Sequence, residues 1–343
     1  MANTRERGKM SKLKLGIIGC GRIAQAHLAA ITFLKDMSEA VAFSDVVMVK
    51  ARETAAKVNA ERCFQDYKEL LASPEVDAVV ICLPHHLHYE ATVAAAEAAK
   101  HVLLEKPMAL TTREAKEMVA VAKKNQITFM VGQSRRFSDA ALTLKRRIAD
   151  IGPIIRIISN FLVHFPEPPT EWWKSGEQSG GDLITYLQTS HSVDFCLWIT
   201  GLIPERVYAK TFSRHPKGYG MKDEQDVILE FPAETTASLH LSLNTQPPLH
   251  DILVVGERGS FRLIEYGLNR PFSFGNRLIL NGEVLMDGEQ TPSNYTLQMQ
   301  EFINAVRDHR EPMASGEEIC SEIQVLEAIN ISARTGETVR VGD

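Results

Sequence analysis

The chain has 343 residues, of which 44% are hydrophobic and 24% charged, and its formal net charge is −5. These values are ordinary for a soluble globular protein of two domains, and the negative balance argues against a nucleic-acid or anionic-membrane partner. Five scattered cysteines without a C-x-x-C pair argue against a disulfide framework or a zinc site. No apolar run is long enough to span a membrane, and the basic N-terminal arm lacks an apolar signal core, so we expect a cytoplasmic protein.

A glycine-rich turn near the N-terminus is the first chemical signal. The apolar run 15–18 predicts a buried strand, and the segment GCGRIA at 19–24 fits G-x-G-x-x-A ahead of a helix expected over 23–34. Gly19 permits the tight turn, Gly21 leaves room for a pyrophosphate, and the helix N-terminus offers unpaired N–H groups. A plain glycine turn is the alternative. The motif predicts a dinucleotide site formed by Gly19, Gly21, Arg22 and Ile23.

An acidic residue at the end of the next apolar run bears on the choice of cofactor. The run 39–44 ends at Asp45, which lies 24 residues beyond Gly21. A carboxylate there accepts hydrogen bonds from the ribose hydroxyls and repels a 2′-phosphate, which favours NAD over NADP. The alternative is a solvated loop aspartate or a helix cap, and Lys50 and Arg52 keep NADP open.

Helices and fully apolar strands alternate up to residue 131. The expected helices cover 51–59, 67–71, 88–100 and, behind a Thr111-x-x-Glu114 capping box, 111–125, and the expected strands cover 77–84, 101–104 and 127–131. Continuous apolar strands indicate a parallel sheet buried on both faces, so we predict a doubly wound Rossmann domain over 13–133. Ligands of such sheets bind beyond the carboxyl ends of the strands, where Gly19, Asp45, Pro84 and Lys106 fall.

Three histidines, His85, His86 and His88, follow the predicted strand 77–84. A protein zinc site needs three or four converging ligands, usually with cysteine or carboxylate support, and none is nearby. We therefore expect no metal and interpret these histidines as polar lining of the cofactor cleft.

Alternating polar and apolar residues replace this pattern in the second half. The expected strands cover 154–161, 207–212, 227–231, 237–243, 252–255, 261–264 and 278–280. Alternation predicts an open, mainly antiparallel sheet with one covered face, and Asn281-Gly282 predicts a hairpin turn. We therefore predict an α+β domain over 134–343, with final helices at 295–307 and about 317–335 that pack back on the first domain.

A less regular segment separates the first two of these strands. It contains Trp172 and Trp173, then Gly180-Gly181, and then His191, which shares one helical face with Asp194 if the segment is a helix. A histidine beside a glycine-rich loop is a candidate general base. The alternative is a histidine bonded structurally to Asp194.

Several of these segments together resemble one family, the Gfo/Idh/MocA oxidoreductases. The shared segments are GCGRIA at 19–24, LPHHLH at 83–88, KHVLLEKPMA at 100–109, IGP at 151–153, Gly180-Gly181 with His191-x-x-Asp194, and NAV, EA and SARTG between 304 and 336. The Glu-Lys-Pro segment is the specific one. The resemblance extends over about 14–341, nearly the whole chain.

The resemblance implies a Rossmann domain, a second domain whose open sheet often forms the oligomer contact, and NAD or NADP as the cofactor. It implies hydride transfer to or from a sugar, polyol or cyclic diol by a homodimer or homotetramer. By motif position, Lys106 and His191 match the catalytic lysine and histidine. Pro84, His85 and His88 match the lining of the cofactor cleft, and Glu105 matches a residue on the nicotinamide side. We expect Asp194, Trp173 and Tyr186 to contact substrate.

The sequence departs from the family pattern at one position. Many members carry aspartate four residues before the histidine, and here that position is Leu187. Asp182, Thr185 and Asp194 are the candidates to replace it.

The sequence leaves the proton acceptor open. Either His191 or Lys106 could accept the substrate proton, and the other residue would then hold the substrate oxygen. An NAD-retaining glycoside-cleaving enzyme and a non-catalytic dinucleotide-binding regulator are the alternative functions.

Overall fold

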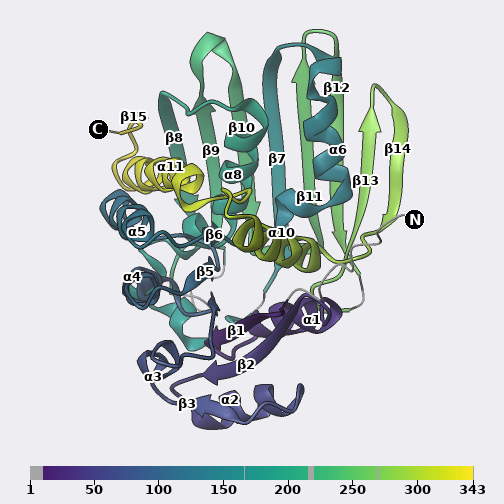
Figure 1. Ribbon diagram of the computed structural model, residues 1–343. Coiled ribbons are helices and arrows are strands. Elements are labelled where there is room, and N and C mark those ends of the chain that lie inside the picture. The colour runs from purple at the N-terminus through teal and green to yellow at the C-terminus, as the bar shows by residue number, and fades with distance from the viewer. Residues whose placement is uncertain (1–10, 166, 215–219, 269, 343) are drawn as a thin grey trace, which may run out of the picture.

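Two sheets organise the protein in the computed structural model, which describes residues 11–165, 167–214, 220–268 and 270–342 (Figure 1). The first sheet has six parallel strands in the order β3-β2-β1-β4-β5-β6. They are β1 (Leu13–Ile18), β2 (Ser38–Ser44), β3 (Arg62–Phe64), β4 (Ala78–Ile81), β5 (His101–Leu104) and β6 (Phe129–Val131). The predicted Rossmann sheet is confirmed, and the strand order reverses between β1 and β4, the usual place for a ligand.

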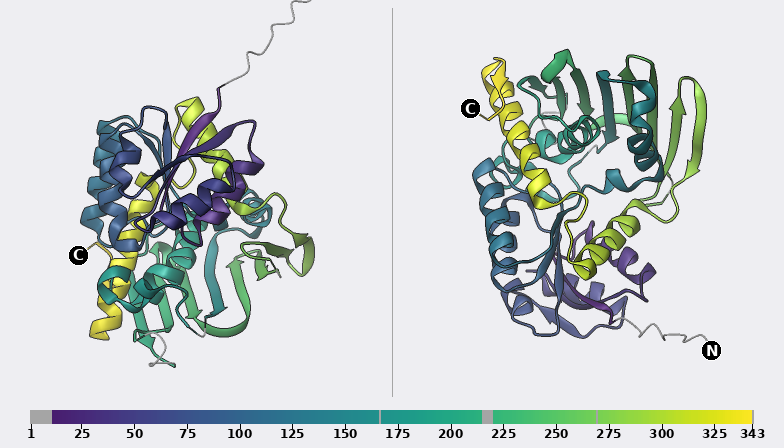
Figure 2. Two further views of the ribbon diagram at one scale, coloured as in Figure 1. Left: turned by 90° about the horizontal axis from the view of Figure 1, so that it is seen from below. Right: turned by 45° about the horizontal axis from the view of Figure 1, so that its top comes forward.

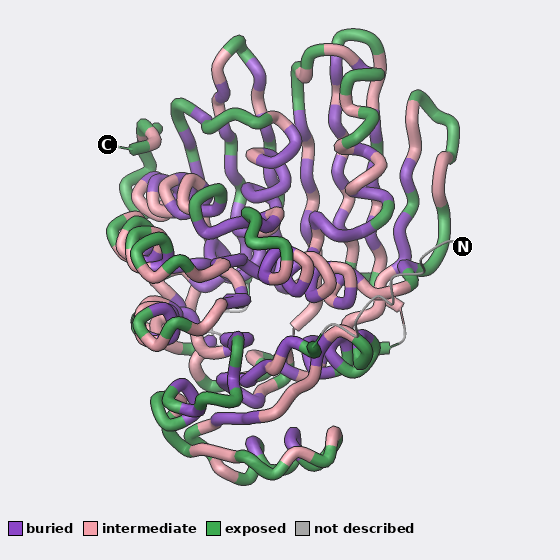
Figure 3. The backbone as a smooth tube through the Cα atoms, in the orientation of Figure 1, coloured by how far each residue is buried: buried purple, intermediate pink, exposed green. Residues whose placement is uncertain are grey.

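Helices cover both faces of this sheet. They are α1 (Ala24–Phe33), α2 (Met48–Ala56), α3 (Tyr67–Leu71), α4 (His88–Glu97) and α5 (Thr112–Lys124). Alternate residues of β4 point to opposite faces of the sheet. Val80 belongs to the hydrophobic cluster that contains α1, and Val79 belongs to the cluster that contains α4 and α5. All four residues of β4 are buried. Figure 3 shows buried segments in the interior of the molecule and exposed segments on the outer helices and hairpin tips. The continuous apolar run therefore reflects a strand covered on both sides, as predicted.

Two details of these helices differ from the prediction. The helix expected over 51–59 begins at Met48, since Asp45 accepts a hydrogen bond from the Val47 N–H at 2.8 Å and so supports an earlier first turn. At α5, Thr111 accepts from the Glu114 N–H at 3.2 Å as the capping box requires, but Glu114 accepts from the N–H of Leu110 at 3.2 Å and not from that of Thr111.

The second sheet has nine strands in the order β14-β13-β12-β11-β7-β10-β9-β8-β15. They are β7 (Ile154–His164), β8 (Arg206–Phe212), β9 (Glu224–Glu230), β10 (Thr236–Ser242), β11 (Asn244–Gly256), β12 (Gly259–Gly267), β13 (Phe274–Leu280), β14 (Glu283–Glu289) and β15 (Val339–Arg340). The sheet is mainly antiparallel, as expected, but β10 runs parallel to β7. The hairpin turn at Asn281-Gly282 is confirmed, with φ of +51° and +89°.

The register shows that the faces of the second sheet differ in composition. One row across it, from β8 to β13, is Tyr208, Ile228, Ser238, Ile158, Leu253, Arg262 and Ile279. Every residue of that row is exposed or half-buried. The neighbouring row contains Leu229, Ala237, Val254 and Phe261, which are buried. The sheet is therefore covered on one face only, as its alternating sequence predicts.

Helices close the covered face and join the two domains. They include α6 (Asp139–Arg147), α7 (Gly176–Ser179), α8 (Ser190–Thr200), α10 (Asn294–Asp308) and α11 (Gly316–Thr335), with the π-helical turn η5 (Thr185–Thr189) directly before α8. Helix α10 packs against α1, and α11 passes α5, α8 and β8, so it contacts both domains (Figure 2). In the described part of the chain, no helix is long and apolar enough to cross a bilayer.

Candidate active site

The glycine turn between β1 and α1 has the shape that a pyrophosphate requires. Gly19 has a φ of +86°, and a Cβ added there would lie 2.5 Å from the Cys82 carbonyl oxygen. A Cβ on Gly21 would meet nothing within 4 Å, so the space beside it is open. Ile23 is the N-cap of α1, and no side chain caps this helix end. The N–H groups of Gln25 and Ala26 donate to the carbonyl oxygens of Arg22 and Ile23, so the N–H groups before them in the turn are the ones open to a phosphate.

Asp45 lies beside this turn at the carboxyl end of β2. Its Oδ2 accepts a hydrogen bond from the Cys20 N–H at 2.9 Å, and its Oδ1 accepts from the Val47 N–H at 2.8 Å. Each carboxylate oxygen has a further lone pair that a ribose hydroxyl can use. Lys50 and Arg52 are exposed on α2. The geometry thus supports the ribose role, while Asp45 also caps the loop as the alternative interpretation held.

The ring of His88 contacts the loop that carries Lys106, and the ring of His85 contacts the second domain. The ring nitrogens of His88 lie 2.7 and 2.8 Å from the carbonyl oxygens of Pro107 and Leu83, the residue before Pro84. The His85 ring packs edge-on against Trp172, with 4.6 Å between ring centroids. Within the described ranges, no group of three or more His, Cys, Asp or Glu side chains could hold a metal ion. His88 therefore connects the loop that carries Lys106 to the end of β4, and the lining of a cofactor cleft by His85 and His88 stays a prediction.

Lys106 reaches from the first domain to the second. Its Nζ donates a hydrogen bond of 2.6 Å to the carbonyl oxygen of Leu187 in η5. Burial lowers the pKa of Lys106 to about 8, against the opposing effect of the Glu105 and Glu322 carboxylates. The Leu187 carbonyl is therefore the hydrogen-bond acceptor at the position where the family pattern has an aspartate side chain. With a pKa of about 8, Lys106 is mostly protonated at pH 7 and loses its proton in the mildly alkaline range.

His191 lies at the start of α8 with its Nδ1 buried and without a hydrogen-bond partner among the described residues. Its ring packs against Phe161, with 5.6 Å between ring centroids. Burial holds the pKa of His191 well below its usual value, and the positive charges of Lys106 and Arg135 act in the same direction. The imidazole is thus neutral at pH 7, the form that accepts a proton.

The three candidates to replace the missing aspartate are all engaged elsewhere. Asp182 accepts from the Thr211 hydroxyl at 3.0 Å, and Thr185 accepts from Gln225 at 2.8 Å. Asp194 accepts from the Arg136 guanidinium at 2.6 and 2.9 Å, and both side chains are buried. The structural His191–Asp194 pair that the spacing suggested is therefore wrong, since Arg136 takes the carboxylate.

The three residues expected to contact substrate, Asp194, Trp173 and Tyr186, have partners within the protein, and their contact with substrate stays a prediction. The Tyr186 hydroxyl donates to the Leu110 carbonyl oxygen at 2.6 Å, and burial raises the pKa of this phenol. Trp173 is buried and packs edge-on against Phe165, with 5.3 Å between ring centroids. These side chains support the wall of the site, which is the usual role of buried aromatic residues.

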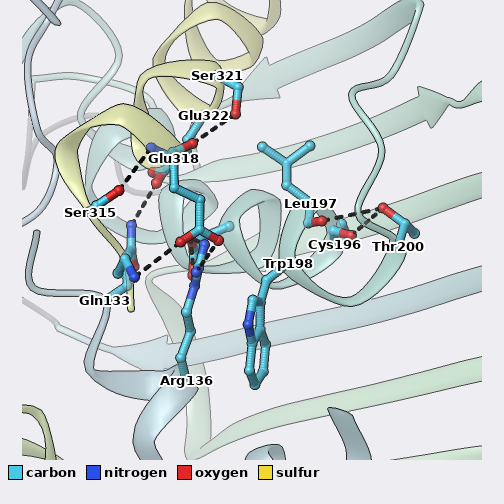
Figure 4. Close-up of polar contacts among 12 residues, drawn as sticks. Gln133, Arg136, Cys196, Leu197, Trp198, Thr200, Ser315, Glu318, Ser321 and Glu322 are labelled. Atoms are coloured by element: carbon cyan, nitrogen blue, oxygen red, sulfur yellow. Dashed lines mark hydrogen bonds and ion pairs between the residues drawn. The ribbon is translucent and has the colours of Figure 1, made fainter. Parts of the chain in front are cut away.

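A polar segment directly after β6 adds residues that the sequence reasoning missed. Gln133 donates from Nε2 to Glu322 of α11 at 2.6 Å, and Arg136 bridges Asp194 and Glu318 (Figure 4). Arg135 donates to the buried Glu265 at 2.7 Å, and its guanidinium lies 4.8 Å from the centroid of the Phe161 ring. The rule applied to the other strand ends, that ligands bind beyond them, would have identified this segment too.

Glu105 has a buried partner that the sequence reasoning also missed. Its Oε1 lies 2.7 Å from Nε2 of His27, which is fully buried on α1. The signal for His27 was a histidine inside an otherwise apolar helix segment, AQAHLAAI. This pair connects the helix behind the glycine turn to the loop that carries Lys106.

Comparisons with known proteins agree with this geometry. The oxidoreductase family with an NAD-binding Rossmann fold matches residues 13–133, and the C-terminal domain of the same Gfo/Idh/MocA family matches residues 141–262. An uncharacterized oxidoreductase of Streptococcus pneumoniae is 30% identical over 259 residues, which are 73% of this chain and 68% of that protein.

Two further relatives extend over more of the chain. The scyllo-inositol 2-dehydrogenase (NAD(+)) of Bacillus subtilis is 26% identical over 338 residues, 96% of each chain. The crystal structure of the WlbA dehydrogenase from Bordetella pertussis in complex with NADH and UDP-GlcNAcA is similar with a TM-score of 0.82 and 26% identity, over 97% of this chain and 100% of that one. The protein therefore belongs to the Gfo/Idh/MocA family of NAD(P)-dependent oxidoreductases, and its first domain is the NAD-binding domain.

Proposed function

We propose that the protein is an NAD-dependent dehydrogenase that acts on a secondary alcohol of a sugar, polyol or cyclic diol. The observation that carries this proposal is the convergence of two groups from different domains. Lys106 follows β5 of the NAD-binding domain, and His191 begins α8 of the second domain. The Lys106 ammonium donates to the carbonyl oxygen of Leu187, about one helical turn before His191, and its charge lowers the pKa of His191. The inositol dehydrogenase named above supports the substrate class.

In alcohol oxidation, His191 and Lys106 have different roles. NAD supplies the hydride acceptor when it is bound. Neutral His191 removes the hydroxyl proton at a ring nitrogen, because its lowered pKa leaves a lone pair free at pH 7. Lys106, held by the Leu187 carbonyl, keeps its ammonium group near the same oxygen and stabilises the negative charge that develops there.

The choice between NAD and NADP rests on Asp45 in this proposal. Its carboxylate is fixed by two backbone N–H groups beside the glycine turn, so it presents a preorganised acceptor to ribose hydroxyls and a negative charge to a 2′-phosphate. NAD is therefore the expected cofactor, although the exposed Arg52 is near enough in sequence for NADP to be tested in parallel.

The test is NADH formation across a panel of sugars, inositols and aromatic diols, with NAD and NADP in parallel. Turnover of one substrate group with NAD, lost in Lys106→Met, is the expected result. A protein that binds NAD but oxidises nothing in the panel would contradict the proposal. Release of an aglycone without net NADH would instead identify the glycoside-cleaving alternative, and tight NAD binding without either reaction would identify the regulator.

We also propose that the protein is a homodimer or homotetramer that buries the open face of the second sheet. Tyr208, Ile228, Ile158 and Leu253 belong to one register row on that face, with Ser238 of β10 between Ile228 and Ile158. Apolar side chains from four strands therefore lie in one row that is interrupted only at β10. Rows of this kind favour contact with a second copy. A monomer in light scattering would contradict this assignment.

We further propose a cytoplasmic location. The five cysteines are free, which is typical of proteins in a reducing compartment.

A further inference from the structure

Arg22, in the glycine turn, extends its side chain toward the second domain. Its guanidinium carbon lies 5.7 Å from the centroid of the Phe165 ring and 5.5 Å from that of Phe272. Phe165 follows β7, and Phe272 lies between β12 and β13. Both distances are within the range of cation–π attraction. One residue of the dinucleotide turn is thus held by two aromatic rings of the other domain.

The N–H groups of this guanidinium have no acceptor in the part of the chain that the structure describes. The contacts that Arg22 makes there are with the two rings. Arg22 is exposed, so these N–H groups face solvent and are accessible to an anion, and their fork of donors matches a phosphate. The open space beside Gly21, the residue before Arg22, is the place where the turn leaves room for a pyrophosphate.

Phe272 is held in an unusual conformation. Its φ is +56°, which is rare for a bulky side chain and costs free energy unless neighbouring contacts compensate. The ring packs edge-on against Tyr295 of α10, with 5.8 Å between centroids, and Tyr295 packs edge-on against His27 at 5.6 Å. The position of the Phe272 ring is therefore fixed from the NAD-binding domain as well.

We propose that Arg22 binds the pyrophosphate of the cofactor and that Phe165 and Phe272 are the positioning residues that hold its guanidinium there. The second domain thereby contributes to cofactor affinity through its two aromatic rings. This proposal rests on the NAD-binding role of the first domain and not on the chemistry of Lys106 and His191. Its test is therefore a binding measurement, which does not depend on finding the alcohol substrate.

The experiment measures dissociation constants of NAD and of ADP-ribose, which has the pyrophosphate but no nicotinamide. Arg22→Ala should weaken both ligands equally, by about 10- to 100-fold for the loss of charge-assisted hydrogen bonds. Phe272→Asn should weaken both by about 2- to 5-fold, the size of a lost cation–π contact. Asparagine tolerates a positive φ, so this variant should keep the fold. Phe272→Tyr, which keeps an aromatic ring, should bind NAD and ADP-ribose like the wild type.

A double variant separates positioning from a general structural effect. If Phe272 acts through Arg22, Phe272→Asn should change nothing further in the Arg22→Ala background. Phe33→Asn, at an exposed phenylalanine at the end of α1, and Arg146→Ala, at an exposed arginine, are the matched controls and should bind like the wild type. Unchanged ADP-ribose affinity in Arg22→Ala, or additive losses in the double variant, would overturn the proposal.

Discussion

The pH dependence of turnover can separate the two roles open to Lys106. Its pKa is about 8 in the folded protein, so the ammonium form predominates below that pH. If the charge stabilises the developing alkoxide, kcat/KM for alcohol oxidation should fall above pH 8, to about half at the pKa and by about tenfold one unit higher. On the acid side the rate should stay level until His191 gains a proton, well below its usual pKa.

Two lysine variants show whether the fall in kcat/KM above pH 8 comes from Lys106. Lys106→Met should lower kcat by about 100- to 1000-fold, the cost of losing one group that stabilises a developing charge, with NAD affinity unchanged. Lys100→Met is the matched control, because Lys100 also donates to backbone carbonyls, those of Ser73 at 3.0 Å and Val76 at 2.7 Å, but away from the site. A kcat/KM that rises through pH 8 would refute the assignment and make neutral Lys106 the proton acceptor.

Three further changes, and one control substitution outside the site, test other parts of the protein. His191→Asn should lower kcat by about 100- to 10,000-fold without changing the dissociation constant of NAD, and full activity would remove the proposed base. Asp45→Ala should lower kcat/KM with NAD by about tenfold or more and shift the NADP/NAD ratio upward, whereas an unchanged ratio in parallel assays would show that Asp45 does not select the cofactor. Asp194→Asn should lower the free energy of unfolding by about 1–3 kcal/mol in urea titrations, because the buried Arg136 loses its buried carboxylate partner and keeps only Glu318, whose side chain is 43% exposed. Arg62→Ala, which breaks an ion pair whose side chains are 44% and 48% exposed, should cost less than about 1 kcal/mol in the same titration.

Most of the first domain could be predicted because its central strands are buried on both faces. An apolar run such as 101–104 then coincides with a strand, and the glycine turn marks the start of α1. The strand that was missed, β3, lies at the sheet edge, and its three residues are exposed or half-buried. The second sheet was harder, because alternation shows which face a residue occupies but not which strand lies beside it. The parallel pairing of β10 with β7 is a long-range choice of that kind. The short strand β15, of two residues, carries too little pattern to be recognised.

In the candidate site, too, short motifs identified individual residues but not their partners. Lys106 and His191 stood out from their local motifs, but the partners of the polar residues came from far along the chain. Asp194 pairs with Arg136, which lies 58 positions earlier, and not with the histidine three positions away. Spacing along a helix indicates only which residues share a face, so it could not identify this partner.

The contact between Lys106 and the Leu187 carbonyl has a consequence for sequence drift in this protein. A side-chain acceptor is lost when its codon changes, but a main-chain oxygen is present whatever residue occupies the position. The hydrogen bond in η5 therefore places no constraint on the identity of residue 187. Packing does constrain it, because Leu187 is buried in the hydrophobic core. Natural variants should therefore exchange one apolar side chain for another there, and proline or an insertion in 185–189 should be rare.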